Sequence, residues 1–437
     1  MDTGQKHHML LVTIGSAGDV YPFLALGAEL KRRGHRVTLV TSLYFEEIVK
    51  QEGLDFIPVG SREDYLKIVQ NPALWDPQQS LKFYGTVVLG QLIRPIYHII
   101  MDYMEKHKNA LLIAQATVFA AQTAHEKHSY PFVTLHLQPA AFRTVYDFPL
   151  LPAWLPRPIK RAIFHALDKF VLDPALTPSL NEFRAELGLE PVKKLMDKWI
   201  HSPQKTIGLF NDWFAPIQPD WPPQTELTGF VLYDPNQDVQ LPEEVQEFLG
   251  AGEAPIVFTP GTSFQHGADF FKVSVEACQM LNKRGLLLTK HKAQIPKNLP
   301  NTVRHIEYVP FGTLLPYTAA LVHHGGVGTL AQALKAGIPQ LIRPVAQDQP
   351  DSAARLEQLG VAASLAPNHY TGKKVAEKLD YLLTSNSVRE ACLLAKASID
   401  SDKAMLQTRQ AIEKMADDSS SKAIEGVCAV GWSLPKP

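Results

Sequence analysis

Two series of alternating β-type and helical segments, one in each half of the chain, constrain the fold more than any other feature. In the first half, apolar runs such as MLLVTIG (9–15) and HRVTLVT (35–41) are separated by longer amphipathic stretches. In the second half, APIVFTPGT (254–262), GLLLTK (285–290) and AALVHHGG (319–326) follow the same rule. Repeated βα units favour parallel sheets covered by helices. The sequence therefore predicts an α/β protein with two Rossmann-like domains.

The length of the chain and one proline-rich stretch indicate where these domains divide. The chain has 437 residues, more than one hydrophobic core usually organises. Residues 216–242 carry many prolines and few periodic apolar positions, as a linker does. We therefore predict an N-terminal domain over 1–220, a linker over 221–245 and a C-terminal domain over 246–400. The remainder, 401–437, is expected to be a helix and polar tail that packs back on the N-terminal domain.

Charge, cysteine content and hydropathy exclude several classes of protein. Lys and Arg number 43 and Asp and Glu 44, so no overall field attracts nucleic acid. The three cysteines, Cys278, Cys392 and Cys428, are too few and too widely spaced for a disulfide framework or a metal cluster. We expect neither an export signal nor a transmembrane segment, and hence a cytoplasmic protein.

The segment RPIKRAIFHALDKFV, residues 157–171, has the pattern of a basic amphipathic helix. Such helices usually bury the apolar face in a core, and this is the interpretation we favour. Peripheral contact with a membrane surface is the alternative.

The stretch LVHHGGVGTLAQALKAGIPQLIRPVAQDQP, residues 321–350, carries the strongest functional signal. A buried strand ends in two histidines, a glycine-rich turn follows, and a helix opens near Thr329. This turn leaves backbone N–H groups free and directs the positive end of the helix toward an anion. His324 and Thr329 can add side-chain donors. The pattern predicts a diphosphate site without a metal ion, formed by Gly325, Gly326, Val327 and Gly328 with these two residues; the alternative is a purely structural turn.

Asp348 and Gln349 stand directly after the next predicted strand. The carboxyl ends of neighbouring parallel strands share one edge of a sheet, where ligands of open α/β sheets bind. A carboxylate beside an amide matches the adjacent hydroxyls of a hexose.

This block resembles the donor signature of the inverting nucleotide-sugar glycosyltransferases, which include plant UDP-glycosyltransferases, sterol glucosyltransferases and bacterial antibiotic glycosyltransferases. The resemblance implies a GT-B fold, in which two Rossmann-like domains face each other across a cleft. It assigns the diphosphate to His324 and Thr329, and the sugar to Asp348 and Gln349. The form HHGGVGT is closer to sterol and bacterial members than to plant members.

The sequence departs from the plant signature at two places. Where plant members carry a base-stacking Trp, this sequence has Tyr308 followed by Val309, and stacking on Tyr308 remains plausible. The ribose-binding Glu of the family falls on Gln332, which brings no charge. These departures leave the base and the sugar of the donor open.

Asp19 lies in the segment GSAGDVYP (15–22), in the first βα turn. Single displacement at an anomeric carbon needs a base that removes the proton of the attacking hydroxyl. Plant relatives use a histidine in the matching turn and several bacterial relatives use aspartate, so the resemblance makes Asp19 the candidate base. The alternative is a turn or helix-capping aspartate.

Weaker signals complete the predicted site. Gly261, Thr262 and Ser263 follow the first strand of the second domain, where family members contact the donor phosphates. An ordinary loop is the equal alternative. The acceptor groove is expected to be lined by apolar side chains of the first domain and one strand-end histidine: Phe83, Leu89, His136 and Phe142.

Within the family, the phrases LWDPQQS, MDKWIHSPQ and VFTPGTS look most like the rhamnosyltransferases of rhamnolipid synthesis. That likeness implies a lipid-like acceptor, while HHGGVGT matches glucosyltransferases. UDP-glucose and dTDP-rhamnose therefore both remain open as donors, with a UDP-hexose slightly favoured. The nucleotide sugar is expected as a co-substrate, with no permanently bound cofactor.

Three other classes compete with this interpretation. An NAD-dependent dehydrogenase is disfavoured, because no G-x-G-x-x-G follows the first strand. A nucleotide-sugar epimerase on the same fold would bind the donor without an acceptor. A catalytically silent partner of another glycosyltransferase is disfavoured by the retention of Asp19, His324 and Asp348.

Overall fold

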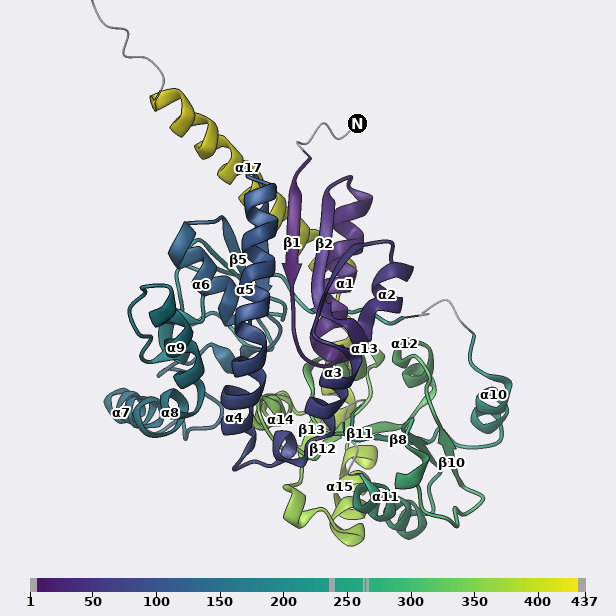
Figure 1. The fold of residues 1–437 in the computed structure, drawn as a ribbon. Coiled ribbons are helices and arrows are strands. Elements are labelled where there is room, and N and C mark those ends of the chain that lie inside the picture. The colour runs from purple at the N-terminus through teal and green to yellow at the C-terminus, as the bar shows by residue number, and fades with distance from the viewer. Residues whose placement is uncertain (1–5, 236–239, 262–263, 265–266, 431–437) are drawn as a thin grey trace, which may run out of the picture.

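The computed structural model describes residues 6–235, 240–261, 264 and 267–430, with side chains as far as Ser421. It contains two parallel sheets, each covered by helices (Figure 1). The predicted α/β class with two Rossmann-like domains is confirmed.

The N-terminal sheet has seven parallel strands in the order β3-β2-β1-β4-β5-β6-β7. Their bounds are β1 His8–Val12, β2 Arg36–Ser42, β3 Asp55–Val59, β4 Leu111–Gln115, β5 Phe132–His136, β6 Lys205–Gly208 and β7 Thr225–Leu227. The covering helices are α1 Ala17–Arg32, α2 Glu46–Gln51, α3 Arg62–Gln70, α4 Ser80–Phe83, α5 Leu89–Lys106, α6 Phe119–His128, α7 Arg157–Leu167, α8 Asp173–Leu176 and α9 Pro178–Glu186. The strand order reverses between β1 and β4, which makes their carboxyl ends the expected binding edge.

The C-terminal sheet has six parallel strands in the order β10-β9-β8-β11-β12-β13. The strands are β8 Ile256–Thr259, β9 Gly285–Leu288, β10 Val303–Ile306, β11 Ala320–His323, β12 Gln340–Ile342 and β13 Ala362–Ser364. The helices are α10 Glu243–Gly250, α11 Ala268–Leu281, α12 Phe311–Leu314, α13 Val327–Ala336, α14 Gln349–Gln358, α15 Gly372–Thr384 and α16 Asn386–Ser398. Here the order reverses between β8 and β11.

Strand β7 lies inside the segment predicted as a linker. It pairs in parallel with β6, in the register Thr206↔Thr225 to Gly208↔Leu227, and so extends the N-terminal sheet beyond the expected boundary at residue 220. Three half-buried residues at a sheet edge carry no hydrophobic pattern, which explains the misplaced boundary.

The two domains share part of their apolar core. Phe142, Phe210 and Trp221 of the N-terminal half cluster with Leu330 and Ala353 of the C-terminal half. A second contact joins Trp75 and Phe264, whose ring centroids lie 5.6 Å apart. Because apolar side chains lose contact with water on both sides of the boundary, this packing holds the domains against each other.

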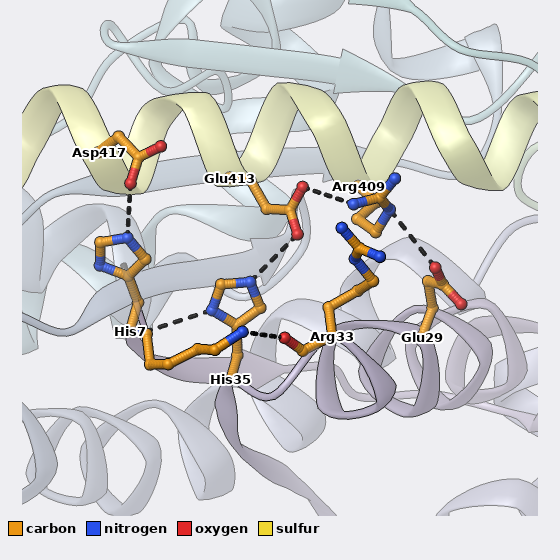
Figure 2. Close-up of polar contacts among 8 residues, drawn as sticks. His7, Glu29, Arg33, His35, Arg409, Glu413 and Asp417 are labelled. Atoms are coloured by element: carbon orange, nitrogen blue, oxygen red, sulfur yellow. Dashed lines mark hydrogen bonds and ion pairs between the residues drawn. The ribbon is translucent and has the colours of Figure 1, made fainter. Parts of the chain in front are cut away.

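The last helix, α17 (Ser401–Val430), returns to the N-terminal domain and packs on α1. Its Ala404, Ala411, Ile412 and Ala416 enter the core beside β1 and β2. Polar contacts flank this seam (Figure 2). Asp417 lies 2.7 Å from His7 Nε2, Glu413 lies 3.1 Å from His35 Nε2, and Arg409 bridges Glu413 and Glu29 of α1. The last helix therefore packs on the same domain that contains the first strand and helix of the chain.

Arg409→Ala tests this seam. Arg409 is largely buried between two carboxylates, so its loss leaves Glu29 and Glu413 less well compensated. We expect the free energy of unfolding to fall by about 1–3 kcal/mol, the usual range for hydrogen bonds to charged groups. Urea denaturation measures the change. Lys414→Ala, an exposed position on the same helix, is the matched control, and equal shifts in both variants would contradict the bridging role.

Candidate active site

The glycine-rich turn between β11 and α13 presents a helix N-terminus at the edge where the C-terminal sheet reverses its order. Gly325 has φ +100°, and a Cβ on it would lie 3.0 Å from Ile342 Cγ2, so only glycine fits this turn. Gly326 caps α13, and Thr329 stands at the third position of the helix. The first amides of α13 have no partner within the helix and carry its positive partial charge.

The two histidines of this turn have different environments. His323 is fully buried: its Nδ1 accepts from the Gly325 N–H at 3.1 Å, and its Nε2 lies 2.9 Å from Gln340 Oε1. Burial lowers the pKa of His323 to about 3, which keeps the ring neutral. These contacts make His323 a structural residue that shapes the turn.

His324 lies beside Gly261 and Gly326. Among the described residues, its buried Nδ1 has no hydrogen-bond partner, and burial lowers the pKa of the ring to about 4. Two glycines make room for the ring: a Cβ on Gly261 would lie 2.8 Å from Cε1, and a Cβ on Gly326 would lie 2.5 Å from Nε2. A neutral imidazole held this tightly is oriented to donate one hydrogen bond to an anion at the helix N-terminus.

Arg343 belongs to the same pocket and was not predicted from the sequence. It follows β12 directly, and it lines one small cavity with His324, Pro260, Phe264, Phe270 and Val345. No residue in the described part of the chain hydrogen-bonds to its buried Nε, and the guanidinium lies 5.4 Å from the Tyr370 ring centroid. A fixed cation with an unused donor next to an unused imidazole nitrogen is suited to a phosphate. The available signal was a basic residue directly after a buried strand, on the binding edge.

Asp348 and Gln349 lie at the N-terminus of α14, after a short loop that follows β12, and their side chains have different contacts. Gln349 Oε1 accepts from the N–H groups of Val345 and Ala346, at 2.7 and 3.2 Å, so its carbonyl oxygen fastens the loop. Asp348 makes no side-chain capping bond and is half-buried. Burial raises the pKa of Asp348 to about 7, and the nearby carboxylates of Asp19 and Asp351 add to the effect.

Asp19 is held at the start of α1 by a network from two strand ends. Its Oδ2 accepts from Ser16 N–H at 2.8 Å, and its Oδ1 accepts from Gln115 Nε2 at 2.8 Å. Gln115, at the end of β4, is itself oriented because its Oε1 accepts from Thr13 Oγ1 and from the Ile14 N–H. Burial raises the pKa of Asp19, and the hydrogen bonds from Ser16 and Gln115 oppose this. Asp19 therefore caps the helix, while its role as a base stays a prediction.

Gln115 is a second residue that sequence reasoning missed. Its signal was a polar residue at the end of an apolar strand, next to the strand that leads to Asp19. Gly15 also serves this arrangement, because its φ of +129° leaves room for the Asp19 carboxylate: a Cβ there would lie 2.3 Å from Oδ2.

The two halves of the site face each other across the domain boundary. The N-termini of α1 and α13 are in contact, and a Cβ on Gly328 would lie 3.9 Å from Gly18 Cα. Asp19 lies near enough to Asp348 to raise its pKa. Two positive helix ends and two carboxylates thus converge where both sheets reverse their strand order.

The remaining donor predictions have mixed outcomes. Tyr308 follows β10 and is 39% exposed, with Lys290 Nζ 5.3 Å from the centroid of its ring. The Val309 side chain is buried in the domain core, so only its backbone could contact a donor. Gln332 is largely buried on α13. Thr262 and Ser263 lie outside the described residues.

Three of the four predicted acceptor-lining residues belong to the core instead. Leu89 packs under the N-terminal sheet, where it is 2% exposed. His136 pairs with His201 at 3.0 Å and packs on Phe142, which stacks in turn on Trp221. Only Phe83 is half-buried. Burial, and then the charge of the nearby Asp19, raise the pKa of Tyr84, the next residue.

A surface cavity of about 400 Å³ lies between the two domains, at the aromatic segment that follows β5. Its walls are residues 146–153 with Lys160 of α7 and Gln358 of α14. Because α14 begins next to Asp348 and rises about 1.5 Å per residue, the cavity lies roughly 15 Å from that carboxylate.

The described residues contain no group of three or more side chains that could together hold a metal ion. Among the helices that the structure describes, none combines the length and the apolar character that a membrane-spanning segment requires.

Two protein-family models match the sequence, one in each domain. Residues 9–146 match the N-terminal domain of glycosyltransferase family 28, and residues 286–414 match the C-terminal domain of proteins like the erythromycin biosynthesis protein CIII. O-mycaminosyltylonolide 6-deoxyallosyltransferase of Streptomyces fradiae is 28% identical, over 82% of this chain and 85% of that protein. A sterol 3-beta-glucosyltransferase of Arabidopsis thaliana is also 28% identical, over 90% of this chain and 63% of its own length. The protein is thus a glycosyltransferase, related to macrolide glycosyltransferases and sterol glucosyltransferases.

Solved structures establish the architecture. The glycosyltransferase of kitacinnamycin superposes with a TM-score of 0.73 at 17% identity, over 94% of this chain and all of that chain. Spinosyn rhamnosyltransferase SpnG, complexed with thymidine diphosphate, gives a TM-score of 0.65 at 16% identity, over 92% of this chain and 100% of that chain. The predicted GT-B fold is confirmed.

Asp348→Asn should stabilise the protein at alkaline pH. The folded-state pKa of about 7 lies above the ordinary 3.8, so between these values the folded protein retains a proton that the unfolded chain has lost. Stability therefore falls as pH rises through this window. We expect the variant to gain about 1–2 kcal/mol at pH 8, allowing for solvent screening at a half-buried site, and to gain nothing at pH 4. Thermal unfolding at both pH values measures this.

Asp380→Asn, at an exposed position on α15, is the control and should have no effect at either pH. A gain that did not depend on pH would contradict the electrostatic origin.

Proposed function

We propose that this glycosyltransferase transfers a hexose or deoxyhexose from a UDP- or dTDP-sugar to a hydroxyl of a small, apolar acceptor. The observation that carries the proposal is the position of Asp19, which lies opposite the N-terminus of α13. The His324 Nδ1 beside that N-terminus has no hydrogen-bond partner among the residues that the structure describes. A base and an anion site on facing helix ends are what transfer from a nucleotide diphosphate requires.

The proposed reaction is a single displacement with inversion. The acceptor hydroxyl gives its proton to Asp19, its oxygen bonds to the anomeric carbon, and the bond from that carbon to the diphosphate oxygen breaks on the opposite face. The negative charge that develops on the diphosphate is stabilised by the first amides of α13, by His324 and by the Thr329 hydroxyl. These groups, together with Arg343, supply positive potential without a metal ion. Asp348 accepts a hydrogen bond from a sugar hydroxyl.

The donor and the acceptor are proposed from chemistry and from relatives. A spinosyn rhamnosyltransferase and the glycosyltransferase VinC have been solved with thymidine diphosphate, which supports a dTDP-sugar. The form HHGGVGT supports a UDP-hexose. Relatives named for tylonolide and sterol substrates support a bulky apolar acceptor. The likeness to the rhamnosyltransferases of rhamnolipid synthesis stays a prediction, as does a cytoplasmic location; the free thiols of Cys278 and Cys392, the cysteines whose side chains the structure describes, support the latter.

Nucleotide binding tests the anion site. Thermal unfolding with UDP, dTDP, ADP and NAD at equal concentration should show a rise with UDP or dTDP, since a ligand of the folded state stabilises it. Gly326→Ala should weaken that nucleotide about ten- to a hundredfold, because the added methyl displaces His324 and a hydrogen bond to a charged group is worth about 1.5–3 kcal/mol.

Gly250→Ala, where the added methyl meets open space, should bind the nucleotide normally. A rise with NAD alone, or with none of the four, would refute the donor site.

Asp19→Asn tests the base. The amide preserves the size and shape of the carboxylate, yet it cannot take a proton, so we expect turnover to fall by about 10²–10⁴-fold while nucleotide affinity is unchanged. Transfer from UDP-glucose and dTDP-rhamnose to a set of hydroxylated lipids and phenols measures turnover, and calorimetry measures affinity. Unchanged turnover would remove Asp19 as the base, and an equal loss of nucleotide affinity would reduce it to a helix cap.

A further inference from the structure

The amphipathic helix at residues 157–171 turns its apolar face outward, contrary to the expectation from sequence. Six large apolar side chains are exposed, with Trp154 at 79% and Phe170 at 70%. We call them the α7 patch: Trp154, Ile159, Ile163, Leu167, Phe170 and Val171. Soluble proteins rarely expose so many large apolar groups together without a partner.

The inward face of α7 explains this orientation. Lys160, Phe164 and Asp168, spaced four residues apart, form the buried stripe. Lys160 Nζ donates to the Tyr146 carbonyl at 3.3 Å, Phe164 packs edge-on against Phe148, and Asp168 pairs with Arg143 at 2.8 Å. Since buried charges must keep their partners, the helix cannot rotate to hide its apolar face.

The charges around the patch are mostly positive. Arg157, Arg161 and Lys169 are exposed, and the single acidic residue between 154 and 171 is the buried, paired Asp168. The neighbouring segment 193–198, which contacts the end of this helix, adds three lysines and one aspartate. A protein with a net charge of −1 therefore concentrates cations around one apolar surface.

We propose that the α7 patch docks the protein on an anionic lipid surface, with the apolar side chains at the level of the headgroups and the cations facing lipid phosphates. Apolar side chains flanked by Lys and Arg on an exposed helix are typical of interfacial binding. A second copy of the protein fits less well, because a twofold interface would bring identical cations together. Helix α7 lies at the edge of the N-terminal domain, away from α17 (Figure 1).

The position of the patch also bears on the acceptor. Lys160 and the segment before α7 line the 400 Å³ cavity, so a lipidic acceptor would enter from the bilayer beside the cavity. This last point rests on the proposed function, whereas docking itself does not.

Flotation of the full-length protein with vesicles tests the docking. Vesicles of phosphatidylcholine with ~30% phosphatidylglycerol have a strongly anionic surface and should bind the protein. Vesicles of phosphatidylcholine alone should bind it at least about tenfold more weakly. Trp154→Ser with Phe170→Ser should abolish binding. Arg161→Glu with Lys169→Glu should weaken it by about fivefold or more per charge.

Leu394→Ser with Tyr381→Ser, which removes exposed apolar groups from the other domain, is the control and should bind normally. All three variants should keep the nucleotide-dependent melting shift of the unmodified protein, so failure of docking and failure of the donor site are distinguishable. The docking proposal is overturned if the protein does not bind anionic vesicles, or if the patch variants bind them as well as the control does. It is also overturned if the protein is a dimer that the substitutions at Trp154 and Phe170 dissociate.

Discussion

The arrangement on which this protein depends is the meeting of two helix N-termini, α1 and α13, at the domain boundary. Each helix follows a glycine turn at the point where its sheet reverses strand order, so each presents unpaired amides to the same space. Two positive ends would repel unless negative charge lay between them. Asp19 and Asp348 supply part of it, and a nucleotide diphosphate would supply the rest.

This concentration of charge is held in place by groups that do not react. Gln115 fixes Asp19 from β4, Gln349 fixes the loop before Asp348, and His323 fixes the turn that carries His324. Each uses one end of its side chain on the backbone and leaves a neighbour oriented toward the ligand space. Such supports are needed because carboxylates with raised pKa values and an unpartnered imidazole are costly to bury.

Helix α17 and the shared apolar core hold the two domains in position relative to each other. Asp417, Glu413 and Arg409 bind α17 to residues near the start of the chain, and the linker joins the same seam through Thr228 and Thr408, whose hydroxyls lie 2.7 Å apart. Phe142 and Trp221 cross the domain boundary as core residues. Their burial makes them part of the packing that holds the two domains together.

Local pattern alone determined much of this protein. Apolar runs separated by amphipathic stretches predicted β1, β2, β8, β9 and β11, whereas β7 is three residues long and carries no such pattern. Asp19, His324 and Asp348 could be identified because each stands in a strand-to-helix turn of recognisable form. The places of Arg343 and Gln115 in the site, and the different environments of His323 and His324, depended on contacts between residues that are distant in sequence. The orientation of α7 likewise depended on contacts with Tyr146, Arg143 and Phe148. A helical pattern in the sequence shows that one face is apolar, but it does not show which face is buried. That depends on the residues that the helix contacts in the folded protein.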